Sequence, residues 1–122
     1  MWEKESREMN WREGMEYAKN LSLGGYDDWR LPTIEELREV VTLCGGVIVE
    51  YKDDDMNAKL DKNIDNKIYQ ANYKAQGFAS SNYWSSTEVV AYVVQYVSFY
   101  SGGASSTVEL DSCFIRCVRA GQ

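Results

Sequence analysis

The sequence of 122 residues contains no histidine, one proline and three cysteines. Without histidine, the chain lacks the side chain that most often serves as a general base or metal ligand near neutral pH. An odd number of cysteines leaves at least one thiol unpaired, which argues against the disulfide framework of small secreted domains. Stability is therefore expected to come from packing of the hydrophobic residues, which make up 44% of the chain.

Basic charge is also scarce, because 13 lysines and arginines stand against 19 acidic residues and the formal net charge is −6. Without a compensating basic patch, such a chain is a poor partner for a phosphate backbone, so we expect no nucleic-acid binding. No apolar run approaches the roughly 20 residues that a membrane helix needs. The N-terminus is charged and unlike a signal peptide. We expect one domain over residues 1–122, without membrane insertion and without a targeting signal, whose location stays open.

Two helices are predicted in the N-terminal half from their capping residues. Asn10 with Glu13, and Thr33 with Glu36, have the spacing of a capping box at a helix start. Apolar residues at the 3.6-residue period follow each box, which is typical of a helix with one buried face. Glycine pairs are expected to stop the two helices, at Gly24 and Gly25 for the first and at Gly45 and Gly46 for the second.

After a short apolar run at residues 47–51, the chain turns polar over residues 52–72. An Asp-x-Asn-x-Asp run that begins at Asp61 imitates the start of a calcium loop. However, Asn66 stands where the sharp-turn glycine belongs, and Asn72 stands where the bidentate glutamate belongs. The prediction is a solvated loop with a short helical turn near 68–73 and no metal.

From Tyr83 onward the hydrophobic period changes to two, which predicts antiparallel strands. Ser101-Gly102-Gly103 supplies the positive-φ residues that a turn between two of these strands needs. The sequence therefore predicts an α+β fold, with two N-terminal helices packed on antiparallel strands.

Residues 89–108 carry no charge, although 26% of the whole chain is charged. The stretch is rich in tyrosine, serine and glycine, a composition shared with antibody binding loops, where tyrosine gives rigid contact area and serine and glycine adapt to polar partners. Val94 and Tyr96 are expected to face inward as core residues. The predicted ligand-binding residues are Ser98, Tyr100, Ser101, Ser105, Ser106, Thr107, Asp111, Ser112 and Phe114.

Three blocks of the sequence carry a family resemblance: GGYDDWRLPT at residues 24–33, YWSST at 83–87 and RCVR at 116–119. In this order they resemble the C-type-lectin-like family that includes the C-terminal domain of collagen-like adhesins (Lcl-C), and the match covers nearly the whole chain. The resemblance implies a C-type-lectin-like fold in which a first strand around Trp2 pairs with a last strand around Val118.

The C-terminal segment is also similar to the variable proteins of diversity-generating retroelements. That resemblance implies a non-enzymatic recognition module, without catalytic residues or cofactors, that displays a sequence-variable surface at about residues 84–116. In that group, adenine-directed mutagenesis yields a restricted set of residue types, and residues 96–108 and 111–115 contain only types of that set. The expected partner is a protein or glycan on a target surface, and the oligomeric state stays open.

Two alternatives remain from the same broad resemblance. Adhesin relatives imply binding of sulfated glycans, which needs a cationic patch, and only Arg116 and Arg119 are expected near the proposed surface. Formylglycine-generating enzymes rely on a close cysteine pair, for which Cys113 and Cys117 are the candidates. The spacing of these two cysteines in a strand puts both on one face and too far apart for an easy disulfide. Trp29 is expected to pack in the core of the domain and not to act in catalysis or ligand binding.

Overall fold

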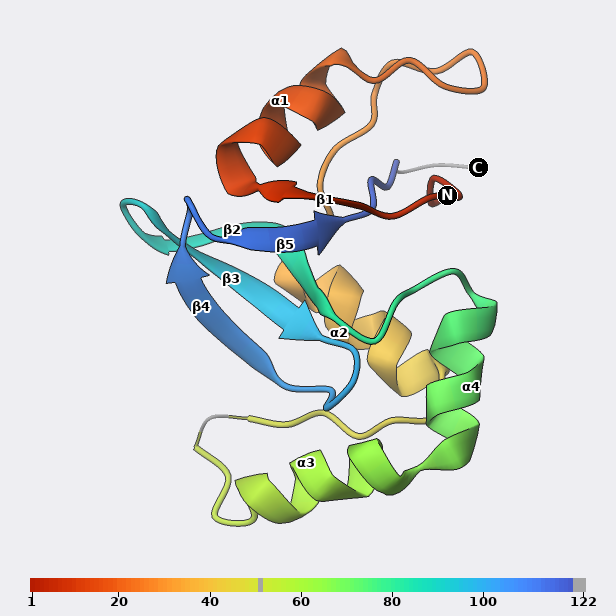
Figure 1. The fold of residues 1–122 in the computed structure, drawn as a ribbon, viewed down its shortest axis with the longest axis vertical. Coiled ribbons are helices and arrows are strands. Elements are labelled where there is room, and N and C mark those ends of the chain that lie inside the picture. The colour runs from red at the N-terminus through yellow and green to blue at the C-terminus, as the bar shows by residue number, and fades with distance from the viewer. Residues whose placement is uncertain (51, 120–122) are drawn as a thin grey trace.

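The computed structural model describes residues 1–50 and 52–119, which form four helices and one five-stranded sheet (Figure 1). The strand order is β1-β5-β2-β3-β4. The elements are β1 (Arg7–Asn10), α1 (Trp11–Asn20), α2 (Ile34–Leu43), α3 (Met56–Asp65), α4 (Lys67–Ala75), β2 (Asn82–Val90), β3 (Val93–Ser98), β4 (Ala104–Val108) and β5 (Ser112–Ile115). This architecture confirms the predicted α+β class and is compatible with the C-type-lectin-like fold.

The starts of α1 and α2 are confirmed, because both predicted capping boxes are formed. The Asn10 side chain accepts a hydrogen bond from the Glu13 amide at 2.9 Å, and the Glu13 carboxylate accepts one from the Asn10 amide at 3.1 Å. Thr33 and Glu36 make the same exchange at 3.2 and 2.8 Å. These reciprocal bonds satisfy amides that have no partner within the helix.

The predicted end of the first helix was wrong. α1 ends at Asn20, because Leu21 already has extended backbone and its amide bonds back to the Ala18 carbonyl. Gly24 and Gly25, with φ angles of 64° and 81°, instead form a tight turn between residues that follow the helix. The glycine pair therefore serves the next loop rather than the helix terminus.

The prediction for the polar stretch 52–72 was right only in part. The helical turn expected near 68–73 lies within α4, whereas the rest, predicted as a solvated loop, forms α3 and the start of α4. Asn66 separates them and caps α4, its side chain accepting from the Tyr69 amide at 2.9 Å. Asp61 lies on α3, so the calcium-like run is helical and its three side chains do not converge as in a calcium loop. Tyr51, at the end of the predicted apolar run, lies outside the described residues.

The sheet confirms the predicted strands and adds one that the sequence did not indicate. β2, β3 and β4 form an antiparallel meander, and β1 pairs antiparallel with β5. β5 joins β2 in parallel at Tyr83 and Phe114. The expected pairing of the chain ends is confirmed by an antiparallel bridge between Trp2 and Val118, whereas β1 was not predicted.

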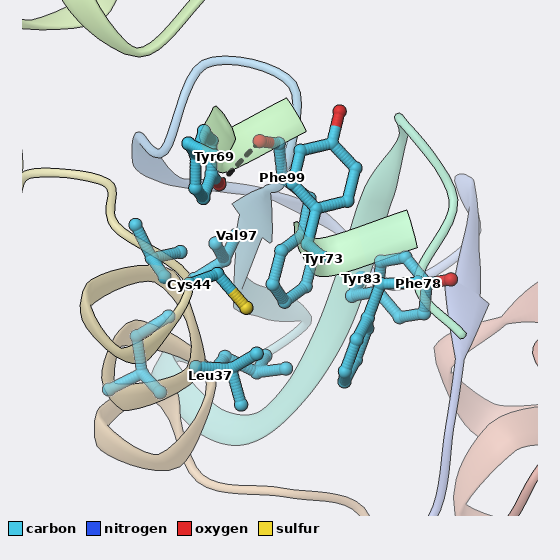
Figure 2. Close-up of a cluster of buried hydrophobic side chains, with 11 residues drawn as sticks. Leu37, Cys44, Tyr69, Tyr73, Phe78, Tyr83, Val97 and Phe99 are labelled. Carbon is cyan, nitrogen blue, oxygen red and sulfur yellow. Dashed lines mark hydrogen bonds between the residues drawn. The ribbon is translucent and has the colours of Figure 1, made fainter. Parts of the chain in front are cut away.

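The two faces of the sheet bury different hydrophobic clusters. On the face covered by α2 and α4, aromatic side chains dominate, and Phe99 stacks on Phe78 with ring centroids 4.4 Å apart (Figure 2). On the face toward α1, Trp11, Trp84 and Ile115 form the second cluster. Within the part of the chain that the structure describes, no helix combines the length and the apolar character that crossing a membrane requires.

Candidate functional site

The strand pairing places a row of polar side chains on the α1 side of the sheet. Directly opposite residues of an antiparallel pair lie on the same side of a sheet. Tyr96 pairs with Trp84 and with Ser105, Asn82 pairs with Ser98, and Val94 pairs with Thr107. Trp84 and Val94 belong to the α1-side cluster, so Tyr96, Ser105 and Thr107 share that side. Asn82 and Ser98 share it as well, because each lies two residues along its strand from Trp84 or Tyr96. α1 packs against β1, β2 and β5, so the row toward β4 lies beyond the helix.

This row continues into the link between β4 and β5 and to the first residue of β5. We call the following seven residues the polar face: Asn82, Tyr96, Ser98, Ser105, Thr107, Asp111 and Ser112. Five of them, together with Cys113, line a shallow pocket of about 270 Å³. The Thr107 hydroxyl donates to the Asp111 carboxylate, which fixes one wall. The polar face therefore offers hydroxyls, one amide, one aromatic ring and a single negative charge.

The polar face contains five of the nine predicted binding residues, and the other four lie elsewhere. Ser106 is exposed on the opposite side of β4, where it pairs with Gln95. Phe114 also points to the opposite side, half-buried, and its ring stacks on Tyr83 with centroids 5.7 Å apart. Tyr100 and Ser101 lie in the β3–β4 turn. The nine residues therefore do not form one continuous surface.

Tyr96 and Asn82 belong to the candidate site although neither was predicted there. Tyr96 contacts Trp84 edge-on, with centroids 6.5 Å apart, yet it is only half-buried and lines the shallow pocket. Val94 is fully buried, as predicted for the inward set. The period of two identified the face of the strand correctly, but it could not show that α1 stops before covering Tyr96.

The β3–β4 turn is held in place by side chains of α3 and α4. Asn63 is buried, and its amide nitrogen donates to the carbonyls of Ser101 and Val47, both at 2.9 Å. Gln70 donates to the Tyr100 carbonyl at 2.8 Å. Tyr100 remains 48% exposed. The turn thus has a fixed main chain and an accessible aromatic side chain.

Gly102 completes this turn for a steric reason. Its φ angle is +73°, and a Cβ at this position would lie 2.3 Å from the Asn63 amide nitrogen. Only glycine allows both the left-handed conformation and the close approach of the amide.

A larger cleft, which sequence reasoning missed, lies between α1 and the β2–β3 hairpin. It has a volume of about 850 Å³, and its lining includes Trp11, Trp29 and Leu31, which are all buried. Met15 and Tyr92 add exposed apolar surface. The absence of glycine, asparagine and aspartate from the tight link Ala91–Tyr92 is the signal that could have drawn attention to this hairpin.

Tyr92 is the one non-glycine residue with positive φ among the described residues, at 68°. A left-handed conformation disfavours a side chain with a Cβ by roughly 1–2 kcal/mol. Despite this, Tyr92 is 62% exposed, so burial of its side chain offsets little of the strain. Strained residues of this kind concentrate at functional sites.

Ion pairs fix two arginines in the wall of the large cleft. Arg12 Nε lies 2.5 Å from an oxygen of the buried Glu109 carboxylate, and this bond raises the pKa of Arg12. Arg30 binds both oxygens of Glu36, at 2.6 and 2.9 Å. The bond from Arg30 is the main cause that lowers the pKa of Glu36 to about 2.

The two arginines expected near the binding surface are used in the interior, which corrects that expectation. Arg116 is buried, donates to the Glu3 carbonyl and lies 4.5 Å over the ring of Phe78. Its burial lowers its pKa. Arg119 pairs with Asp28 at 2.7 and 3.1 Å. Neither arginine lines the shallow pocket of the polar face.

All three cysteines are buried and unbridged. Burial is the main cause that raises the pKa of Cys113 to about 12 and also raises the pKa of Cys44 and Cys117. Because the thiolate is the reactive form, these thiols are poor nucleophiles near neutral pH. Among residues 1–50 and 52–119, no three side chains of histidine, cysteine, aspartate or glutamate are grouped as metal ligands.

Trp29 is buried, and its indole nitrogen donates to the Leu23 carbonyl at 3.2 Å. It therefore has the packing role that was predicted, although one side of it borders the large cleft.

The geometry defines an α+β domain with an accessible polar sheet face and a neighbouring cleft. The family model of the Lcl C-terminal domain matches residues 1–119. The chain therefore belongs to the family of Lcl C-terminal domains, which agrees with the resemblance carried by its three sequence blocks. A comparison with curated proteins found no matching relative.

Proposed function

We propose that this domain is a non-enzymatic recognition module whose polar face, together with the Tyr100–Ser101 turn, binds a protein or glycan on a target surface. The observation that carries the proposal is the composition of this accessible surface. It combines two tyrosine rings, several hydroxyls and one carboxylate, on strands whose opposite side packs into an aromatic core. Such a surface makes contacts through rigid aromatic area and adaptable hydrogen bonds.

The burial of the cysteine thiols supports a binding function for the domain and argues against an oxidase function. An oxidase of the cysteine-pair type requires accessible sulfurs that reach the thiolate form, whereas Cys113 and Cys117 are buried and have raised pKa values. Thiol labelling of the native domain distinguishes the two functions. A binding module should react with a thiol reagent only after unfolding, and rapid labelling of the native state would favour the oxidase.

We further propose that the segment at about 84–116 displays a variable surface, as in the variable proteins of diversity-generating retroelements. The polar-face residues support this, because Ser98, Ser105 and Thr107 project from strands without forming the two core clusters. Substitutions there should leave the core intact. A reverse-transcriptase gene with an imperfect copy of this segment in the neighbouring DNA would support the proposal.

A pair of libraries on a display platform tests the tolerance that this proposal requires. One library randomises Ser98, Ser105, Thr107 and Ser112, and the other randomises four buried core residues: Tyr83, Trp84, Val97 and Phe99. Resistance to a protease reports folding. Most clones of the first library should remain folded and most of the second should not. Similar losses of folding in both libraries would contradict a role of the polar face in variation.

Family membership also favours a second candidate, binding of sulfated glycans as in adhesins. Such binding depends on cationic groups and weakens strongly with added salt. Arg116 donates to the Glu3 carbonyl and Arg119 pairs with Asp28, so neither is available to bind a sulfate group. We therefore rank sulfated-glycan binding below the first proposal. Titration of the domain with heparin at low and high salt separates the candidates, since contacts through the uncharged residues of the polar face depend little on salt.

A further inference from the structure

The cleft between α1 and the β2–β3 hairpin has the size and lining of a ligand site and lies outside the polar face. Its volume of about 850 Å³ falls in the range of small-molecule pockets, and its base is aromatic and aliphatic. The polar face and this cleft have no lining residue in common. The cleft can therefore serve a second function, independent of the function proposed above.

The charges around the cleft favour a cation. Six charged residues line it, three of each sign, and Glu36 adds a fourth carboxylate through its pair with Arg30. Arg12 and Arg30 are thus neutralised. Among the described residues, Glu16, Glu88 and Lys19 take part in no ion pair, so two carboxylates and one ammonium remain available.

Tyr92 indicates where the ligand makes contact. Its exposed ring lines the cleft from a hairpin position where glycine would relieve the backbone. The face of an aromatic ring attracts a cation, and this attraction grows when water is excluded. The neighbouring Glu88 comes from the same hairpin and supplies the complementary charge.

We propose that this cleft binds an organic cation, a small molecule with an aromatic or aliphatic body and one ammonium or guanidinium group, and that Tyr92 and Glu88 are its principal contacts. Trp11, Trp29 and Leu31 receive the apolar body at the base of the cleft. The ammonium group lies toward the hairpin, where the free carboxylate of Glu88 and the ring of Tyr92 are available.

Three indole compounds test the proposal with the 15N-labelled domain; they share an ethyl side chain and differ in the charge of the group that ends it. Tryptamine is the cation, tryptophol the neutral analogue and indole-3-propionate the anion. Binding is read from the indole Nε1–H signals, because Trp11 lines the cleft whereas Trp84 does not. Tryptamine should shift the Trp11 signal and leave Trp84 unchanged, with a dissociation constant about tenfold below that of the anion.

Two variants and two matched controls assign the contacts. Tyr92→Gly and Glu88→Gln should each weaken tryptamine binding about fivefold or more without lowering the melting temperature. Tyr100→Gly changes an exposed tyrosine outside the cleft, and Glu39→Gln changes an exposed carboxylate on α2, so neither should alter binding.

Equal affinity for the three compounds would overturn the charge preference, and unchanged Trp11 signals would overturn the site. Unaltered tryptamine binding in both Tyr92→Gly and Glu88→Gln would also overturn the proposed contacts. None of these results bears on the polar face, whose proposed function rests on the library experiment and fails independently.

Discussion

The two faces of one sheet have opposite characters, although the same strands supply both. α2 and α4 cover one face, where Tyr69, Tyr83 and Phe99 are fully buried (Figures 1 and 2). On the other face, α1 covers the region of β5 and β2 and leaves the β3–β4 side to solvent as the polar face. The comparison teaches that the covered face supplies rigidity, which leaves the residues of the uncovered face free for the binding that we propose.

Phe99 and Tyr100 are adjacent in the sequence, but one is buried under the covered face and the other is exposed. Their substitution tests the contrast between the two faces and includes the largest expected change in stability. Phe99→Ala should destabilise the domain by about 3–5 kcal/mol, because a fully buried ring stacked on Phe78 would leave a cavity. Tyr100→Ala, one residue further, should cost less than about 1 kcal/mol because Tyr100 is 48% exposed. Chemical denaturation measures both. Equal losses would mean that the turn, not the covered core, determines stability.

Asn63 joins the covered side of the molecule to the turn beside the polar face. Asn63→Ala should cost about 2–4 kcal/mol, since the carbonyls of Val47 and Ser101 and the Val47 amide would lose their partner in a buried place. The control is Asn57→Ala on the exposed side of α3, expected within about 0.5 kcal/mol. Urea denaturation and hydrogen exchange at residues 100–103 provide the readout. Unchanged exchange in Asn63→Ala would show that the turn holds its shape alone.

Local signals made α1 and α2 predictable, because each capping box lies within four residues. α3 was missed and α4 was predicted only as a short turn, because their anchors are few and distant: Asn63 reaches Ser101, and Tyr69 donates to the Phe99 carbonyl at 2.5 Å. One local signal was present, since Asn66 caps α4 in the manner expected of asparagine. A polar composition therefore concealed helices whose few buried residues meet the core at isolated points.

The candidate site shows the same limit of sequence reasoning. The uncharged stretch pointed to the strands that carry most of the polar face, and five of the nine predicted residues lie on that face. The spacing could not show that β5 turns Phe114 onto Tyr83, or that α1 and the β2–β3 hairpin enclose a cleft. Both features depend on contacts between segments about 30 to 80 residues apart.

Glu36, at the start of α2, should make the stability of the domain depend on pH, with an effect of intermediate size. Its folded pKa of about 2 lies below the ordinary value of about 4.3, so the carboxylate stabilises the fold fully above about pH 5. That stability is lost as pH falls from about 4.5 through 2. With an allowance for solvent screening, we expect a loss of about 1–2 kcal/mol.

Denaturation of Glu36→Gln from pH 7 to pH 2 checks this effect. The variant should be less stable at neutral pH and should lose less stability on acidification than the parent. Glu39→Gln on the same helix is the control and should follow the parent curve, because Glu39 is exposed. A parallel acid response in parent and Glu36→Gln would show that the Arg30–Glu36 pair contributes little to the fold.

Substitution of Tyr92 should have the smallest effect on the stability of the domain, and it should raise the stability where the preceding substitutions lower it. Tyr92→Gly should stabilise the domain by about 0.5–1 kcal/mol, because glycine adopts the φ angle of 68° without the steric penalty of a Cβ. At Tyr100, whose φ is not positive, glycine should instead destabilise by a similar amount through the added freedom of the unfolded chain. Thermal and urea denaturation of the two variants measure the pair. A loss of stability in Tyr92→Gly would show that contacts of the ring within the domain outweigh the backbone strain, and the tyrosine would then be retained for the fold and not for a ligand.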